Sequence, residues 1–91
     1  MITTDQAIAQ ITTAYHTRDA QADHKGAGVH LGDIVDLIDL PDALYRQTIL
    51  AMVGAGTMLL EPEPKLRNLA KADHDAAIMC GGEIKHTIWI R

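Results

Sequence analysis

The sequence contains no phenylalanine and no serine, and its only aromatic residues are Tyr15, Tyr45 and Trp89. Its core must therefore be built from Ile, Leu, Val, Met and Ala, which suits small helices packed against a short sheet. No apolar run approaches the ~20 residues that a membrane-spanning helix needs, so we expect no membrane span. The single cysteine, Cys80, cannot form a disulfide within the chain, which fits a reducing cytoplasm.

Basic charge is scarce as well, because 8 Lys and Arg face 12 Asp and Glu, for a net charge of −4. Residues 1–40 carry six Asp against two basic residues, whereas residues 41–91 carry six acidic and six basic residues. All of the excess negative charge thus lies in the first forty residues. This distribution excludes a strongly cationic coat for nucleic acid, but it allows a local basic patch in the second half.

What remains is a chain of 91 residues that is 47% hydrophobic and 22% charged. That composition is typical of a globular protein rather than a disordered one, and the length predicts a single domain over residues 1–91. The first residues lack the basic and apolar regions of a secretory signal. We therefore expect the protein in the cytoplasm.

Hydrophobic spacing predicts three helices in the first half. Thr3 and Gln6 form a capping-box pattern ahead of a helix with one apolar face. That face comprises Ala7, Ile8, Ile11 and Tyr15. Residues 29–30 are predicted as a short strand and residues 31–38 as a compact helix. Pro41 starts a third helix, because proline is tolerated in a first turn but not in a helix interior. Its inward stripe is predicted to be Tyr45, Thr48, Ile49 and Met52.

The second half is predicted to alternate between strand and helix. Residues 57–61 form a strand that the prolines at 62 and 64 end, and a helix follows within residues 66–79, clearest over 71–79. Gly81 and Gly82 are predicted to stop that helix. Residues 83–91 read as the clearest strand, with Ile84, His86, Ile88 and Ile90 on one face.

This order of elements resembles a winged helix-turn-helix domain. In that family an apolar residue at the turn precedes a second helix, which ends in an apolar residue four positions before a glycine. Leu40, Met52 and Gly56 stand at those places, and residues 57–61 provide the following strand. The resemblance implies an α+β fold, mostly helical, with a short antiparallel sheet. Residues 62–83 depart from the pattern, because they form an unusually long wing insertion that contains a helix.

The resemblance also implies a function, which is binding of double-stranded DNA by a transcriptional regulator. Outward residues of the presumed recognition helix are Ala43, Arg46, Gln47 and Leu50, of which Arg46 and Gln47 suit bases or phosphates. In the presumed wing, Lys65, Arg67 and Lys71 lie in an acid-free stretch and could approach phosphates. An ordinary solvated face is the better explanation for these three cations, since short clusters of charge commonly have no specific role. The predicted DNA-binding residues are therefore Ala43, Arg46, Gln47, Lys65, Arg67 and Lys71.

Catalytic and metal sites have little support in the sequence. His74, Cys80 and His86 are of the types that bind zinc, but their spacing matches no established zinc pattern. His86 is better explained as a hydrogen-bonded core histidine, and Cys80 as a small buried residue beside the glycine pair. The two Gly-Ala-Gly fragments lack the third glycine of a nucleotide-binding loop. We therefore expect no enzyme, no cofactor and no metal.

Two functional hypotheses remain. The first is sequence-specific DNA binding by a homodimer, because paired domains of this family read paired half-sites and the first helix has a broad apolar face. The second is a non-catalytic protein-interaction module of the same fold that binds no DNA. The acidic first half and the outward Leu50 favour this alternative.

Overall fold

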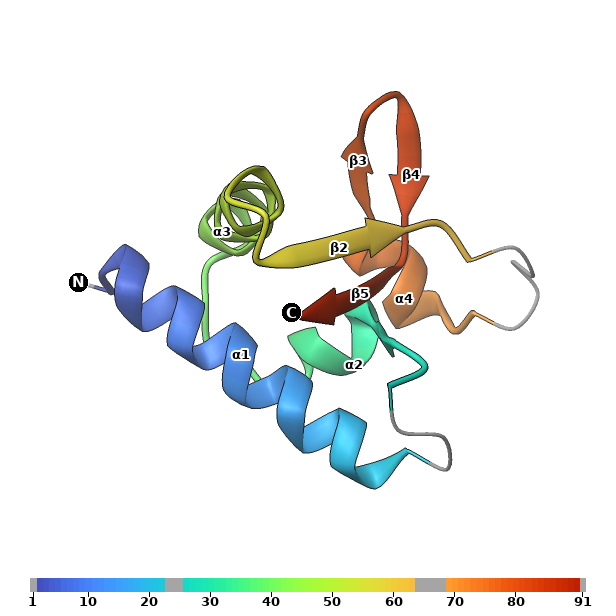
Figure 1. The fold of residues 1–91 in the computed structure, drawn as a ribbon, viewed down its shortest axis with the longest axis horizontal. Coiled ribbons are helices and arrows are strands. Elements are labelled where there is room, and N and C mark those ends of the chain that lie inside the picture. The colour runs from blue at the N-terminus through green and yellow to red at the C-terminus, as the bar shows by residue number, and fades with distance from the viewer. Residues whose placement is uncertain (1, 23–25, 64–68, 91) are drawn as a thin grey trace.

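The computed structural model describes residues 2–22, 26–63 and 69–90 and shows an α+β domain with four helices and short antiparallel sheets. In chain order the elements are α1 (Thr4–Gln21), β1 (Val29–His30), α2 (Leu31–Val35), α3 (Asp42–Gly54), β2 (Met58–Glu61), α4 (Lys71–Ala76), β3 (Ile78–Cys80), β4 (Glu83–Lys85) and β5 (Thr87–Ile90). Figure 1 shows α1 running along one side of the domain, while the hairpin of β3 and β4 projects from its body. The α+β class expected from the sequence is confirmed.

The main sheet has the strand order β1-β5-β2, and both pairs are antiparallel. Met58, Leu60 and Ile88 lie on its inner face and are buried, whereas Leu59 on the other face is exposed. The inner face packs with α1, α2 and α3 into one hydrophobic core. The final strand therefore lies in the middle of the sheet, between two strands that precede it in the chain.

Helix α1 begins as the capping box predicts. The Gln6 N–H donates to Thr3 Oγ1 at 3.1 Å, and the Thr3 N–H donates to Gln6 Oε1 at 2.8 Å. Ala7, Ile11 and Tyr15 are buried in the domain's own core, and Ile8 is partly buried. The apolar face that suggested a homodimer is thus largely used within the chain, so the homodimer stays a prediction without that support.

The helix pair α2 and α3 confirms most of the pattern predicted for it. Pro41 lies directly before α3. The inward-facing stripe of α3 is buried as expected and comprises Tyr45, Thr48, Ile49 and Met52. Helix α2 ends at Val35, three residues short of the predicted end. Its final turn tightens where the Leu37 N–H donates to the Ile34 carbonyl at 3.0 Å. Beyond it, the Asp39 N–H donates to Gln10 Oε1 at 2.8 Å, which links the turn after α2 to α1.

The helix predicted within residues 66–79, clearest over 71–79, is present as α4 but is wrong beyond Ala76, and residues 66–68 lie outside the described residues. Residues 78–80 form β3 instead, and Gly81 and Gly82 make the turn of a hairpin with β4 rather than a helix stop. Both glycines have positive φ, at 62° and 83°, which a two-residue hairpin turn of the I′ type requires. The sequence signal was ambiguous, because paired glycines suit a helix end and a hairpin turn equally.

The single strand predicted over residues 83–91 is also wrong, because it divides at His86 into β4 and β5. The backbone N–H of His86 donates to the Glu61 carbonyl, while its own carbonyl accepts from the Leu31 N–H. Ile84 consequently belongs to the small hairpin sheet and is 52% exposed, whereas Ile88 is buried. The alternation of residues 83–91 predicts that Ile84 and Ile88 lie on the same face. In the structure only Ile88 faces the core.

Close packing of α4 against α2 depends on Gly32. A Cβ atom at this position would lie 2.7 Å from the Asp73 nitrogen and 2.8 Å from the Ala72 carbonyl carbon. No side chain fits that space, because real Cβ atoms essentially never approach so closely. Gly32 therefore allows the first turn of α4 to lie directly on α2.

The buried Met52 on α3 provides a test of the orientation of this helix. Met52→Ala should reduce the free energy of unfolding by about 2–5 kcal/mol, the usual cost of a large-to-small core change. The matched control is Leu50→Ala on the same helix, where the side chain is 41% exposed. The control substitution should change the free energy of unfolding by less than about 0.5 kcal/mol. Similar losses for both variants in urea unfolding would contradict this orientation.

Candidate functional site

The outer face of α3 holds three of the residues predicted to contact DNA. Ala43 and Gln47 are exposed there, together with Leu50. Arg46 lies beside them but is only partly exposed, because its side chain turns toward α4. Gln47 is therefore the one side chain with base-reading chemistry that stands open on this part of the described helix.

Arg46 binds the end of α4. Its Nη2 donates to the Asp75 carbonyl at 2.9 Å, and its Nη1 donates to the Ala77 carbonyl. Its Nε donates to Asp42 Oδ2 at 2.9 Å, one turn earlier on α3. All three sides of the guanidinium are thus occupied within the chain. These bonds direct the guanidinium toward α4, so a base or phosphate contact by Arg46 would have to use its remaining N–H donors or break them.

Tyr45 completes this contact, which we call the α3–α4 clamp: Tyr45 and Arg46 with the carbonyls of residues 75–77. The Tyr45 hydroxyl donates to the Ala76 carbonyl at 2.8 Å, and the Arg46 guanidinium lies 5.9 Å from the Tyr45 ring centroid. Burial raises the pKa of Tyr45, so its hydroxyl remains a proton donor. The clamp satisfies carbonyls that the end of a short helix leaves without partners.

The predicted wing residues are only partly described. Lys65 and Arg67 lie outside the described residues. Lys71 begins α4, and its Nζ lies 2.8 Å from Asp75 Oδ2, one turn further along the helix. The bond to Asp75 raises the pKa of Lys71. Lys71 is thus a strongly exposed cation with a carboxylate already beside it, and such pairs contribute little to stability.

A cluster of histidines and carboxylates joins β1, α4 and the start of β5. His30 Nε2 lies 3.3 Å from Glu63 Oε2, and His30 Nδ1 lies 3.6 Å from Asp73 Oδ2. His86 is buried, and its Nδ1 accepts a bond from the Glu63 N–H at 3.3 Å. Burial lowers the pKa of His86, and His74 adds to this effect, while Asp73 and Glu63 partly oppose it. The expectation of a hydrogen-bonded core histidine is confirmed.

The described part of the chain contains no group of three or more His, Cys, Asp or Glu side chains that could hold a metal ion. The rings of His74 and His86 lie edge to face, with centroids 5.8 Å apart. Cys80 is half-buried and pairs with Glu83 across the β3–β4 hairpin. The three residues of the possible zinc set thus occur in α4, in β3 and beside β5.

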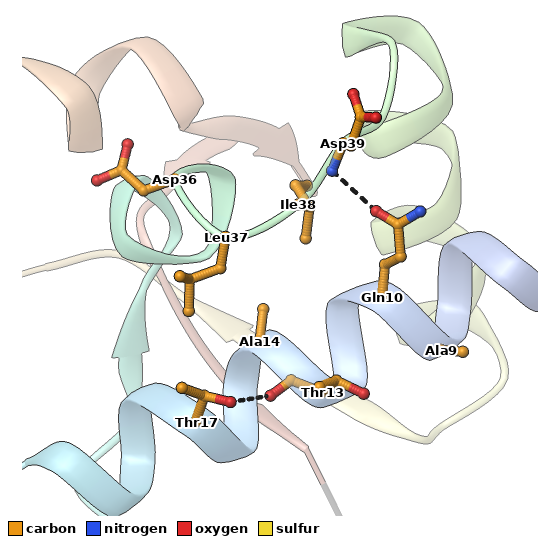
Figure 2. A pocket seen from close by; sticks show the side chains of 9 residues that line it. All are labelled: Ala9, Gln10, Thr13, Ala14, Thr17, Asp36, Leu37, Ile38 and Asp39. Carbon is orange, nitrogen blue, oxygen red and sulfur yellow. Dashed lines mark hydrogen bonds between the residues drawn. The ribbon is translucent and has the colours of Figure 1, made fainter.

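A groove of about 570 Å³ separates α1 from the turn formed by residues 36–39. Figure 2 shows Leu37 and Ile38 pointing toward α1, while the carboxylates of Asp36 and Asp39 stand at the rim. The wall on α1 consists of Ala9, Gln10, Thr13, Ala14 and Thr17. Short side chains along this wall leave room for a group from outside.

The rim of this groove is negatively charged. Asp36 and Asp39 are exposed, and their carboxylates form no hydrogen bond or ion pair with any other described residue. Leu37 lies between them and is 45% exposed. No local pattern in the sequence predicts this surface, although Leu37 is the one leucine of residues 31–38 that is off the apolar stripe. The groove itself appears only when α2 packs on α1.

No helix in the described residues is both long and apolar enough to cross a membrane. Comparison of the chain with protein-family models, curated proteins and solved structures found no match in any of the three. The function must therefore be argued from the surfaces described above.

The α3–α4 clamp predicts a specific loss of stability. Arg46→Ala should lower the free energy of unfolding by about 1–3 kcal/mol, because two carbonyls and a carboxylate lose a charged donor. Gln47→Ala changes the next, exposed residue and should cost less than about 0.5 kcal/mol. Urea unfolding measures both values. Equal effects would show that Arg46 is not bound to α4 in solution.

The lowered pKa of His86 predicts that acid destabilises the fold. The unfolded chain protonates this residue near its ordinary pKa of 6.5, whereas the folded chain protonates it at lower pH. The free energy of unfolding should therefore fall as the pH decreases from about 7.5 to 5.5. His86→Asn retains an acceptor for the Glu63 N–H and should flatten this dependence, whereas His16→Asn on exposed α1 should not. Unchanged pH dependence in His86→Asn would refute the assignment.

Proposed function

We propose that this chain is a non-catalytic protein-interaction module with a winged helix-turn-helix fold, and that the groove between α1 and residues 36–39 is its binding surface. The fold assignment is supported by the element order α1-β1-α2-α3-β2-β5, which matches the order expected for that family. The insertion between β2 and β5 contains α4 and the β3–β4 hairpin in place of a simple wing.

The observation that carries the proposal is the internal use of Arg46. Helix α3 has no other Lys or Arg, so the clamp leaves its outer face without a free cation. The remaining described cations also have acceptors within the chain. Arg18 donates to the Asp33 carbonyl, Lys71 pairs with Asp75, and Lys85 Nζ lies 4.0 Å from Glu83 Oε1. Binding to DNA depends on Lys and Arg that neutralise phosphates.

An accessible apolar residue supports the groove as the interaction surface. Leu37 is exposed at a concave site with short side chains opposite, which is the geometry that a partner side chain needs in order to be buried. Leu50 on α3 is also exposed, but it does not line the neighbouring groove that α1, α3 and β5 form. The groove between α1 and residues 36–39 is therefore a better candidate for the interaction surface than the exposed Leu50.

Sequence-specific DNA binding is the second candidate, and the exposure of Gln47 and Ala43 on α3 favours it. Such binding would rely on Gln47 for base contacts and on cations outside the described residues, such as Lys65 and Arg67. In a DNA complex each phosphate contact changes the salt slope of binding by about one unit. This slope separates the two candidates experimentally.

A peptide selection tests the interaction function without a known partner. The immobilised domain is exposed to a random peptide library on phage, and enriched peptides are then titrated against purified variants. We expect enriched peptides whose affinity falls about tenfold or more in Leu37→Ser, the effect of losing roughly 1.4 kcal/mol at an interface. Leu59→Ser is the matched control, because Leu59 is 41% exposed on the far side of the sheet.

A duplex titration provides the opposing outcome. Fluorescent random DNA duplexes are titrated with the domain at about 20 mM salt and again at higher salt, and we expect no salt-dependent binding. If the domain binds the duplexes with an affinity that falls as salt rises, and Gln47→Ala lowers that affinity, the DNA-binding function is supported and the interaction function is rejected. A selection that enriches no peptide would reject the interaction function.

A further inference from the structure

The chemistry around the groove specifies the kind of partner that it would accept, and this step rests on the proposed interaction function. Asp36 and Asp39 stand on one rim, Asp33 precedes them by one turn on α2, and Asp5 lies one turn before Ala9 on α1. All of these residues are exposed. The groove thus combines apolar side chains, among them Leu37 and Ile38, with the carboxylates of its rim.

We propose that the groove binds a cationic amphipathic helix of a partner protein, which buries one apolar side chain against Leu37 and places Lys or Arg beside Asp36 and Asp39. Charge complementarity selects this occupant, because juxtaposed charges of like sign disfavour a partner. Phosphates of nucleic acids and anionic lipid headgroups would be repelled by the same carboxylates. A cationic protein segment gains from both the concave surface and its rim.

The α1 wall favours a helix as the bound conformation. Ala9, Thr13 and Thr17 follow each other at intervals of four residues, so they lie in one row along α1. Such a row of short side chains allows the ridge of a second helix to approach closely. The row extends over eight residues, or roughly 12 Å, which corresponds to about two turns of a bound helix. At one end, the bond from the Asp39 N–H to Gln10 Oε1 holds the two walls together.

A second copy of this chain does not fit the site as well. Each Lys and Arg in the described part of the chain already lies beside an acceptor within that chain, so the carboxylates of a copy would compete with these internal acceptors. Sedimentation of the domain alone distinguishes this case. Self-association that Asp36→Asn/Asp39→Asn abolishes would overturn the proposed occupant.

The probe is a fluorescein-labelled peptide of 14 residues designed as an amphipathic helix, with leucines along one face and lysines beside them. A second peptide carries glutamate at every lysine position. Fluorescence anisotropy is measured with the wild-type domain and its variants, and circular dichroism verifies that each variant is folded. We expect the lysine peptide to bind with an affinity that falls as salt rises, and the glutamate peptide not to bind.

Two double variants that each remove two negative charges distinguish binding in the groove from non-specific electrostatic attraction to the acidic domain. Asp36→Asn/Asp39→Asn should weaken binding of the lysine peptide about three- to tenfold, the effect of losing two exposed ion pairs. Glu61→Gln/Glu83→Gln removes the same charge from exposed sites on β2 and β4 and should leave the affinity within about twofold. Equal losses in the two double variants, or no binding of the lysine peptide, would overturn the proposal.

Thr13→Arg gives an independent test, because it fills the groove and adds a cation without altering the aspartates. It should abolish binding of the lysine peptide while α1 remains folded, since Thr13 is exposed. If Thr13→Arg binds as well as the wild type, the peptide does not occupy the groove. Phage peptides that depend on Leu37 but not on Asp36 and Asp39 would preserve the interaction function and reject only the cationic partner.

Discussion

The α3–α4 clamp is the contact on which the arrangement of the second half of the domain depends. Helix α4 has six residues, too few to be stable without tertiary contacts. Tyr45 and Arg46 bind the carbonyls at its end, and Gly32 gives its first turn space against α2. The segment between β2 and β5 is therefore held by both α2 and α3, and the β3–β4 hairpin projects from this base (Figure 1).

The same contact determines the charge that the domain presents to a partner. Because Arg46 is the only cation of α3, the clamp directs the positive charge of this helix toward Asp42 and the end of α4. The carboxylates of Asp36 and Asp39 have no such internal partner among the described residues, and they remain exposed beside Leu37. One internal contact and one open groove thus favour an anionic protein-binding surface over a nucleic-acid surface.

Predictions from the sequence were correct where the signal was local. The capping box at Thr3 and Gln6 and the start of α3 after Pro41 depend on neighbours within one helical turn. They failed between residues 77 and 86. There a glycine pair suits both a helix end and a hairpin turn. Alternation also cannot reveal that residues before His86 pair in one sheet and residues after it in another. Alternation therefore predicts one shared face for Ile84 and Ile88, whereas Ile84 pairs with Met79 on an exposed hairpin.

The sequence by itself determined the α+β class, the inward stripe of α3 and the excess of negative charge in the first forty residues, because composition and helical spacing specify these directly. Only the tertiary structure decided what Arg46 binds and where a groove exists. Helical spacing places Arg46 on the outer side of α3, but its long side chain reaches α4, which is 29 to 31 residues further along the chain. The groove likewise forms from α1 and residues 36–39, whose juxtaposition depends on packing rather than on any local pattern.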